Sequence, residues 1–114
     1  MLDVTLLAVA DPTRRAICQR LAHGRATVGQ LAGLFPISRP AVSQHLRVLL
    51  DAGIVRRAGT SRQSPYEFSP VPILEIEAWA RSVAASWQAA PLPGPFTNRE
   101  ERNVRAAERG HPQP

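Results

Sequence analysis

The sequence contains no lysine and only one cysteine, and the shortage of cysteine excludes two kinds of site. Cys18 has no second cysteine in the chain with which to form a disulfide or a cysteine-cluster zinc site. The 14 basic residues are all arginines, and against nine acidic residues they leave a net charge of +5. Such a balance favours an anionic partner, because basic side chains displace counterions from phosphate groups.

Long hydrophobic runs are missing as well. No apolar segment approaches the roughly 20 residues that span a bilayer. The N-terminal segment MLDVTLLAVADPTRR is acidic before a short apolar run and lacks the basic start of a secretory signal. We therefore expect a cytoplasmic protein with no membrane partner.

The length of 114 residues is enough for one hydrophobic core and too short for two ordinary domains. We expect residues 1–90 to form a single folded domain. Residues 91–114 begin with a proline-rich stretch and continue with charged residues, and they contain few large apolar side chains. This composition predicts a mobile C-terminal tail.

Apolar residues recur at helical spacing through the first half of the chain, which predicts four helices. The first carries Leu2, Thr5, Leu6 and Val9. The next three follow the capping residues Asp11, Thr27 and Ser38, and they end at His23-Gly24, Phe35-Pro36 and Gly53. A short capped helix, a turn and a second helix with one buried stripe form a helix-turn-helix.

After Gly53 the pattern changes to two short strands, Ile54–Arg57 and Pro65–Phe68, around a turn-rich tip. This is typical of a β-hairpin, and its tip carries Gly59, Thr60, Ser61 and Arg62. A long helix begins at Val71. The predicted fold is therefore mainly α with a small β-hairpin wing: a winged helix-turn-helix with the order α-α-α-α-β-β-α.

The fourth helix has two contrasting faces. Val42, Leu46, Leu49 and Leu50 form the inward stripe, and the opposite face is polar. Arginine there can pair with phosphate or guanine, and Gln44 can contact adenine through two hydrogen bonds. Any helix turns polar residues to water, but this face precedes a basic wing. The candidate DNA-binding residues are Ser38, Arg39, Pro40, Ser43, Gln44, His45, Arg47, Arg56, Arg57 and Arg62, with partial burial of His45 as the alternative for that residue.

The last helix has an apolar stripe broader than one domain requires, with Leu74 and Trp79 beside it. Two apolar faces on a terminal helix predict packing on its own domain and on a partner chain. The candidate dimer-interface residues are Leu2, Leu6, Ile73, Ile76, Ala80, Val83 and Trp87.

The segments ADPTRRAICQRLAHGRATVGQLA and ISRPAVSQHLRVLLDAGIVRR resemble the ArsR/SmtB winged-helix repressors, over residues 9–87. The resemblance implies a symmetric homodimer that binds an inverted-repeat operator in double-stranded DNA. It also implies repression of an operon that includes or neighbours its own gene, and release of DNA on a signal. Activation is an open alternative, because operator position decides whether a bound regulator excludes or recruits polymerase.

The sequence departs from the metal-sensing members of this family. The third helix has no cysteine, and the last helix has neither histidine nor cysteine. Glu75 and Glu77 are two apart, so on a helix they point in different directions. We expect no metal and no cofactor. The chain also lacks a nucleotide-binding glycine loop and an acid–base pair, so we expect no enzymatic activity.

Three alternatives remain open for the signal and the partner. Cys18 could sense oxidants if Arg14 or Arg15 lowered its thiol pKa, although a buried packing role is the simpler interpretation. An apolar effector could bind at the dimer interface near Trp79 and Trp87. The winged scaffold could instead serve as a protein-interaction module. The sequence names no effector.

Overall fold

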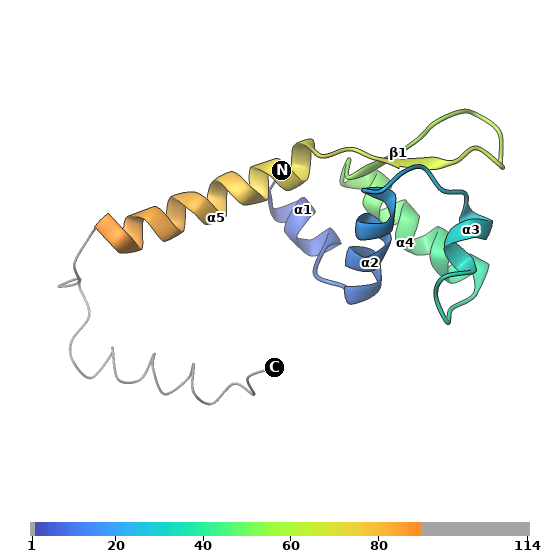
Figure 1. The fold of residues 1–114 in the computed structure, drawn as a ribbon, viewed down its shortest axis with the longest axis horizontal. Coiled ribbons are helices and arrows are strands. Elements are labelled where there is room, and N and C mark those ends of the chain that lie inside the picture. The colour runs from blue at the N-terminus through green and yellow to red at the C-terminus, as the bar shows by residue number, and fades with distance from the viewer. Residues whose placement is uncertain (1, 90–114) are drawn as a thin grey trace. The chain divides into compact units, whose positions relative to one another are not determined.

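The structure is a computed structural model, and it describes residues 2–89; the tail expected from residue 91 lies outside them. Its elements follow the predicted order (Figure 1). They are α1 (Leu2–Ala8), α2 (Pro12–Leu21), α3 (Val28–Ala32), α4 (Arg39–Asp51), β1 (Val55–Arg57), β2 (Tyr66–Phe68) and α5 (Val71–Ala89). Residues up to Ser82 belong to one compact unit, and the last part of α5 belongs to a second. The winged helix-turn-helix expected from the sequence is confirmed.

The junction between α1 and α2 is built from the Asp-Pro-Thr-Arg-Arg segment. Asp11 caps α2, and its carboxylate accepts the backbone N–H of Arg14 at 2.9 Å. The guanidinium groups of Arg14 and Arg15 donate to the carbonyls of residues 7–10 at 2.5–3.2 Å. These carbonyls lie at the C-terminal end of α1, where a helix leaves its acceptors unpaired. Both arginines therefore hold α1 against the start of α2.

The third helix is shorter than the sequence indicated. The predicted capping box is present, since Thr27 and Gln30 each accept the other's backbone N–H through their side chains. The helix ends at Ala32, however, and not at Phe35-Pro36. The amide of Leu34 bonds back to the carbonyl of Leu31, three residues earlier, and this tighter turn closes the helix.

The core lies where α2, α3, α4 and the start of β1 meet. Its fully buried aliphatic side chains include Ile17, Leu31, Val42, Leu46, Leu49 and Ile54. Burying a side chain of this size contributes roughly 1.5–3 kcal/mol. Leu50, which the sequence placed on the inward stripe, is only partly buried. The inward stripe of α4 is therefore confirmed for three of its four residues.

The chain leaves α4 through a glycine turn. Gly53 has φ +74°, in the left-handed region. Its amide donates to the carbonyl of Leu50 at 2.9 Å, and the amide of Ile54 donates to that of Leu49 at 3.0 Å. These two bonds make a Schellman motif, and the buried side chains of Leu49 and Ile54 supply its apolar contact. The turn sets the direction in which the hairpin leaves α4.

The hairpin of residues 55–68, called the wing below, pairs Val55 with Phe68 and Arg57 with Tyr66. The backbone of Tyr66 also exchanges two hydrogen bonds with Ala26, at 2.8 and 3.1 Å. The wing is thus tied directly to the segment that precedes α3, a contact the sequence did not predict.

Candidate nucleic-acid interface

The polar face of α4 lies at the surface. Ser38, Arg39, Pro40, Ser43, Gln44 and Arg47 are all exposed, opposite the buried stripe. Ser38 caps the helix, because its hydroxyl accepts the backbone N–H of Ala41 at 3.3 Å. The structure therefore brings six of the predicted contact residues together along one helix.

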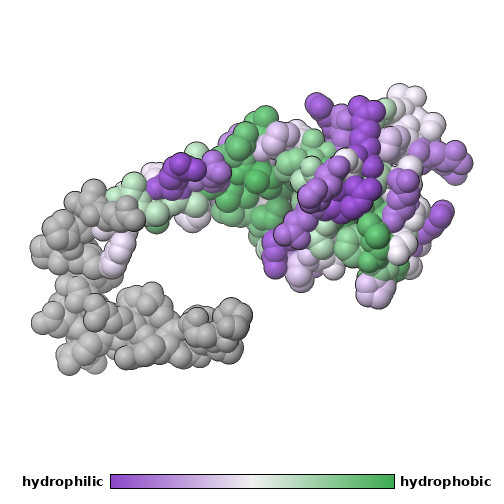
Figure 2. All heavy atoms as spheres, in the orientation of Figure 1, coloured by the Kyte–Doolittle hydropathy of each residue, from purple (hydrophilic) through white to green (hydrophobic). Residues whose placement is uncertain are grey.

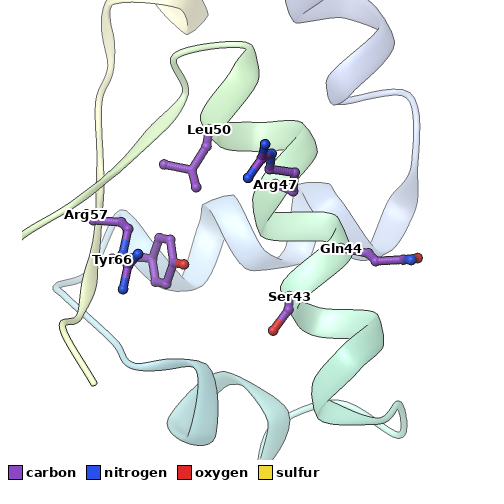
Figure 3. A pocket seen from close by; sticks show the side chains of 6 residues that line it. All are labelled: Ser43, Gln44, Arg47, Leu50, Arg57 and Tyr66. Atoms are coloured by element: carbon purple, nitrogen blue, oxygen red, sulfur yellow. The ribbon is translucent and has the colours of Figure 1, made fainter. Parts of the chain in front are cut away.

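A groove of about 420 Å³ runs between α4 and the wing (Figure 3). Ser43, Gln44, Arg47 and Leu50 line it from α4, and Arg57 and Tyr66 line it from the wing. Leu50 reaches toward the Tyr66 ring, whereas Gln44 points away from the wing. The groove combines apolar surface with two guanidinium groups and the hydroxyls of Ser43 and Tyr66. This combination suits the sugar and phosphate of a nucleic-acid backbone.

Arg57 is held in place within this groove. Its guanidinium carbon lies 5.7 Å from the centre of the Tyr66 ring, within the range of a cation–π contact. The same guanidinium donates to the backbone carbonyl of Ser61 at 2.5 Å. Neither contact involves an acidic group. Arg57 is therefore held in one orientation and keeps its positive charge.

Arg56 points to the opposite face of the wing, because successive residues on a strand alternate sides. Its Nε lies 2.6 Å from one carboxylate oxygen of Glu67, and the Nε of Arg25 lies 2.8 Å from the other. These two hydrogen bonds lower the pKa of Glu67, with that from Arg56 the larger cause. The structure therefore separates Arg56 from the other predicted contacts. Sequence reasoning missed Glu67, although its position opposite Arg56 in the hairpin was a usable signal.

His45 lies between α4 and the start of α2. Its Nδ1 is 3.4 Å from a guanidinium nitrogen of Arg14 and 3.9 Å from the carboxylate of Asp11. Its side chain is 23% exposed. This placement favours the packing alternative for His45 over a phosphate contact.

The remaining predicted cations are accessible. Arg39 lies over Gly29 of α3, where an added Cβ would come within 2.8 Å of its guanidinium. Arg47 pairs loosely with Asp51 at 3.7 Å, and both side chains are more than two-thirds exposed. Arg62 is exposed at the tip of the wing and forms no ion pair with any residue in the range 2–89. Each of them can reach an external anion.

The predicted dimer residues differ in exposure. Leu2 and Leu6 are half-buried, and Ile73 packs on the core. Val83 and Trp87 are 52% and 67% exposed. Sequence reasoning left out Leu7, which is 70% exposed. Figure 2 shows apolar side chains gathered over α1 and the beginning of α5, with strongly polar ones on the part that carries the helix-turn-helix and also along α5.

Cys18 lies in the core, an environment that favours the packing role over the redox alternative. Burial raises the pKa of its thiol to about 11, whereas a sensing thiol needs a lowered one. Neither Arg14 nor Arg15 contributes to the pKa of this thiol, and both guanidinium groups are directed to the carbonyls at the end of α1. Among residues 2–89 no three histidine, cysteine or acidic side chains gather as a metal site would require. No helix in this range is long and apolar enough to cross a membrane.

Comparisons with known proteins agree with this geometry. The model of a family described as a helix-turn-helix domain matches residues 9–58, which contain α2, α3, α4 and β1. The chain is 44% identical over 97 residues to the HTH-type transcriptional regulator Rv2034 of Mycobacterium tuberculosis, covering 79% of this chain and 89% of that one. It is 32% identical to a probable mercury resistance operon repressor of Streptomyces lividans, covering 73% and 66%.

A solved structure is also similar to this chain over most of its length. The crystal structure of the ArsR family transcriptional regulator RHA00566 superposes with a TM-score of 0.73 at 33% identity, over 79% of this chain and 93% of that one. Similarity of this extent covers the helix-turn-helix and the wing together. The chain therefore belongs to the ArsR/SmtB family of DNA-binding winged helix-turn-helix transcriptional repressors.

Proposed function

We propose that the chain acts as a homodimer on an inverted-repeat operator and represses an operon that includes or neighbours its own gene. The observation that carries this proposal is the groove between α4 and the wing. Helix-turn-helix proteins insert the second helix of the motif into the major groove. In that position the groove described here receives the adjoining DNA backbone.

Within this arrangement each side chain has a distinct role. Arg47 and Arg57 bind a backbone phosphate from the two walls of the groove, and Ser43 donates its hydroxyl to the same strand. Gln44, which points away from the wing, reads a base edge in the major groove. Arg39 binds at the start of α4, and Arg62 binds phosphate or the minor groove at the wing tip.

The proposed dimer uses the apolar surfaces of α1 and α5. Exposed apolar side chains in the first unit include Val71, Leu74 and Trp79 on α5 and Val4 and Leu7 on α1. The end of α5, in the second unit, separately exposes Val83 and Trp87. An exposed apolar surface of this kind typically marks a protein–protein contact. A two-fold dimer places its two α4 helices roughly 34 Å apart, in successive major grooves. Because its target is chromosomal DNA, the proposal also places the protein in the cytoplasm.

The test starts from a duplex selected by the full-length protein from a random DNA library. Affinity for this duplex and for a scrambled one is measured at several salt concentrations. Each phosphate contact adds about 0.9 to the slope of log affinity against log salt. We expect Arg57→Ala to weaken binding to both duplexes and to reduce the slope by about one.

Two further variants complete the design. Gln44→Ala should change the selected sequence, and Arg81→Ala serves as the control, since Arg81 is an exposed arginine on α5 paired with Glu77 at 3.5 Å. Equal binding of the wild type to both duplexes, or equal effects of Arg57→Ala and Arg81→Ala, would contradict the proposed function.

A further inference from the structure

Glu67 is the acidic residue of the wing, and it bridges two arginines from different segments. One carboxylate oxygen accepts from Arg56 on β1 and the other from Arg25, which precedes α3. The side chain of Glu67 is only 20% exposed, whereas those of Arg25 and Arg56 are 62% and 68% exposed. The two guanidinium groups therefore lie at the surface with a carboxylate placed between them.

The bridge is not needed to hold the wing in place. Ala26 and Tyr66 already join the same two segments through a pair of backbone hydrogen bonds at 2.8 and 3.1 Å. Ion pairs with exposed guanidinium groups, such as those of Arg25 and Arg56, typically contribute little to stability. Glu67 is thus a second link between these segments, and it is the one that places a negative charge between two exposed arginines.

The position of Glu67 relative to the groove gives it an effect on DNA. The Arg56–Glu67 pair is the next pair along the hairpin from the Arg57–Tyr66 pair, with its side chains on the opposite face of the wing. The Debye length is about 10 Å at 0.1 M salt and longer at lower salt, so charges on this face of the wing still act on DNA bound at the wing when the salt concentration is low. Freed from Glu67, Arg25 and Arg56 would attract phosphates regardless of DNA sequence.

From this placement we infer that Glu67 is a specificity-determining residue: it holds Arg25 and Arg56 away from the DNA backbone and thereby limits non-specific binding. This inference rests on the proposed function. Glu67 acts through the two arginines and does not itself contact DNA. The cations that do bind DNA are then those of α4, the groove and the wing tip.

Glu67→Gln tests the inference, because the amide keeps the shape and one acceptor but removes the charge. We expect affinity of the full-length variant for a scrambled duplex to rise about three- to tenfold at low salt, with a salt slope steeper by about one to two. Affinity for the selected duplex should rise less, so the ratio of selected to scrambled binding falls. Arg56→Gln should lower affinity more in the Glu67→Gln background than in the wild type.

Glu77→Gln is the matched control, since it removes the same charge from a carboxylate paired with Arg81 on α5. It should leave the slope and the ratio unchanged. An unchanged slope in Glu67→Gln, or weaker binding to both duplexes at the wild-type slope, would overturn the inference and leave the proposed function standing. Failure of the wild type to prefer its selected duplex would overturn both.

Discussion

Arg57 lies directly across the wing from Tyr66, and its guanidinium carbon is 5.7 Å from the centre of the tyrosine ring. The contact orients a cation toward α4 without neutralising it. A cation–π contact at an exposed site contributes roughly 0.5–1 kcal/mol. The ring of Tyr66 is therefore a positioning element for Arg57.

Tyr66→Leu should weaken DNA binding by about two- to fivefold, the factor that corresponds to the cation–π contribution. Because no charge is removed, the salt slope should stay at its wild-type value, unlike that of Arg57→Ala. The backbone hydrogen bonds of this residue to Ala26 do not depend on its side chain. A Tyr66→Leu variant with the reduced slope of Arg57→Ala would show that Arg57 loses its phosphate contact without the ring, and that the ring does more than orient it.

The turn at Gly53 makes a prediction about stability. At φ +74° an alanine is strained, while the nearest atom to its Cβ, in Pro72, is at an ordinary 3.8 Å. Gly53→Ala should therefore lower the free energy of unfolding by about 1 kcal/mol or more, as measured by urea denaturation. Gly33→Ala is the control, because Gly33 has φ −71° and ordinary contacts, and it should be neutral or stabilising. Equal effects would contradict a conformational cause.

Protonation of Asp11 should lower the stability of the fold in acid. The backbone N–H of Arg14 is the largest cause of its lowered pKa, and the charges of His45 and Arg14 add to it. A lowered pKa stabilises the fold fully above the ordinary aspartate pKa of about 3.9, and this stabilisation is lost as the pH falls through the lower folded value. Asp11→Asn keeps the capping oxygen without the charge, so its stability should fall less steeply below about pH 4.

The measurement for Asp11 is the urea midpoint at a series of acidic pH values. Asp51→Asn, which removes an exposed carboxylate from the C-terminal end of α4, controls for the loss of one charge. Parallel curves for the wild type and Asp11→Asn would show that the charge of Asp11 makes no pH-dependent contribution to stability.

Cys18 should be unreactive in the folded protein. With a pKa of about 11, on the order of one thiol in ten thousand is ionised at pH 7, and the side chain is 9% exposed. Labelling by a disulfide reagent should be slow in buffer and fast in urea, and oxidant should leave DNA affinity unchanged. Rapid labelling of the native protein together with loss of DNA binding would restore the redox alternative.

The proposed dimer can be tested at an exposed leucine of α1. Leu7→Glu should leave the fold intact, because Leu7 is 70% exposed, but it should convert the dimer to a monomer in sedimentation equilibrium. Leu34→Glu introduces the same change at a leucine that is 57% exposed between α3 and α4, and it should stay dimeric. If both variants keep the mass of the wild type, α1 is not part of the interface.

The elements that sequence could predict are those set by local rules. The caps of α2, α3 and α4 and the buried stripe of Val42, Leu46 and Leu49 depend on residues within a few positions of one another. The glycine turn after α4 likewise depends on residues that are close together in the sequence. Each of these follows from helical periodicity and capping alone.

The orientation of individual site residues depends on contacts distant in sequence, and there prediction was incomplete. His45 turns toward Arg14, 31 positions away, and Glu67 holds Arg25, 42 positions away. The sequence alone does not distinguish the adjacent residues Arg56 and Arg57, but strand alternation and their pairing partners place them on opposite faces of the wing. A sequence pattern predicts which face of a helix or strand is buried. Which distant residue each side chain contacts is known only from the structure.

The most direct test of the groove neutralises one DNA phosphate at a time. The selected duplex is synthesised with a single methylphosphonate at each backbone position in turn, and affinity is measured for the wild type and for Arg57→Ala. The account predicts, in each half-site, a position where the neutral linkage weakens binding by the wild type but not by Arg57→Ala. If every position affects the two proteins equally, Arg57 does not bind the DNA backbone and the assignment of the groove is wrong.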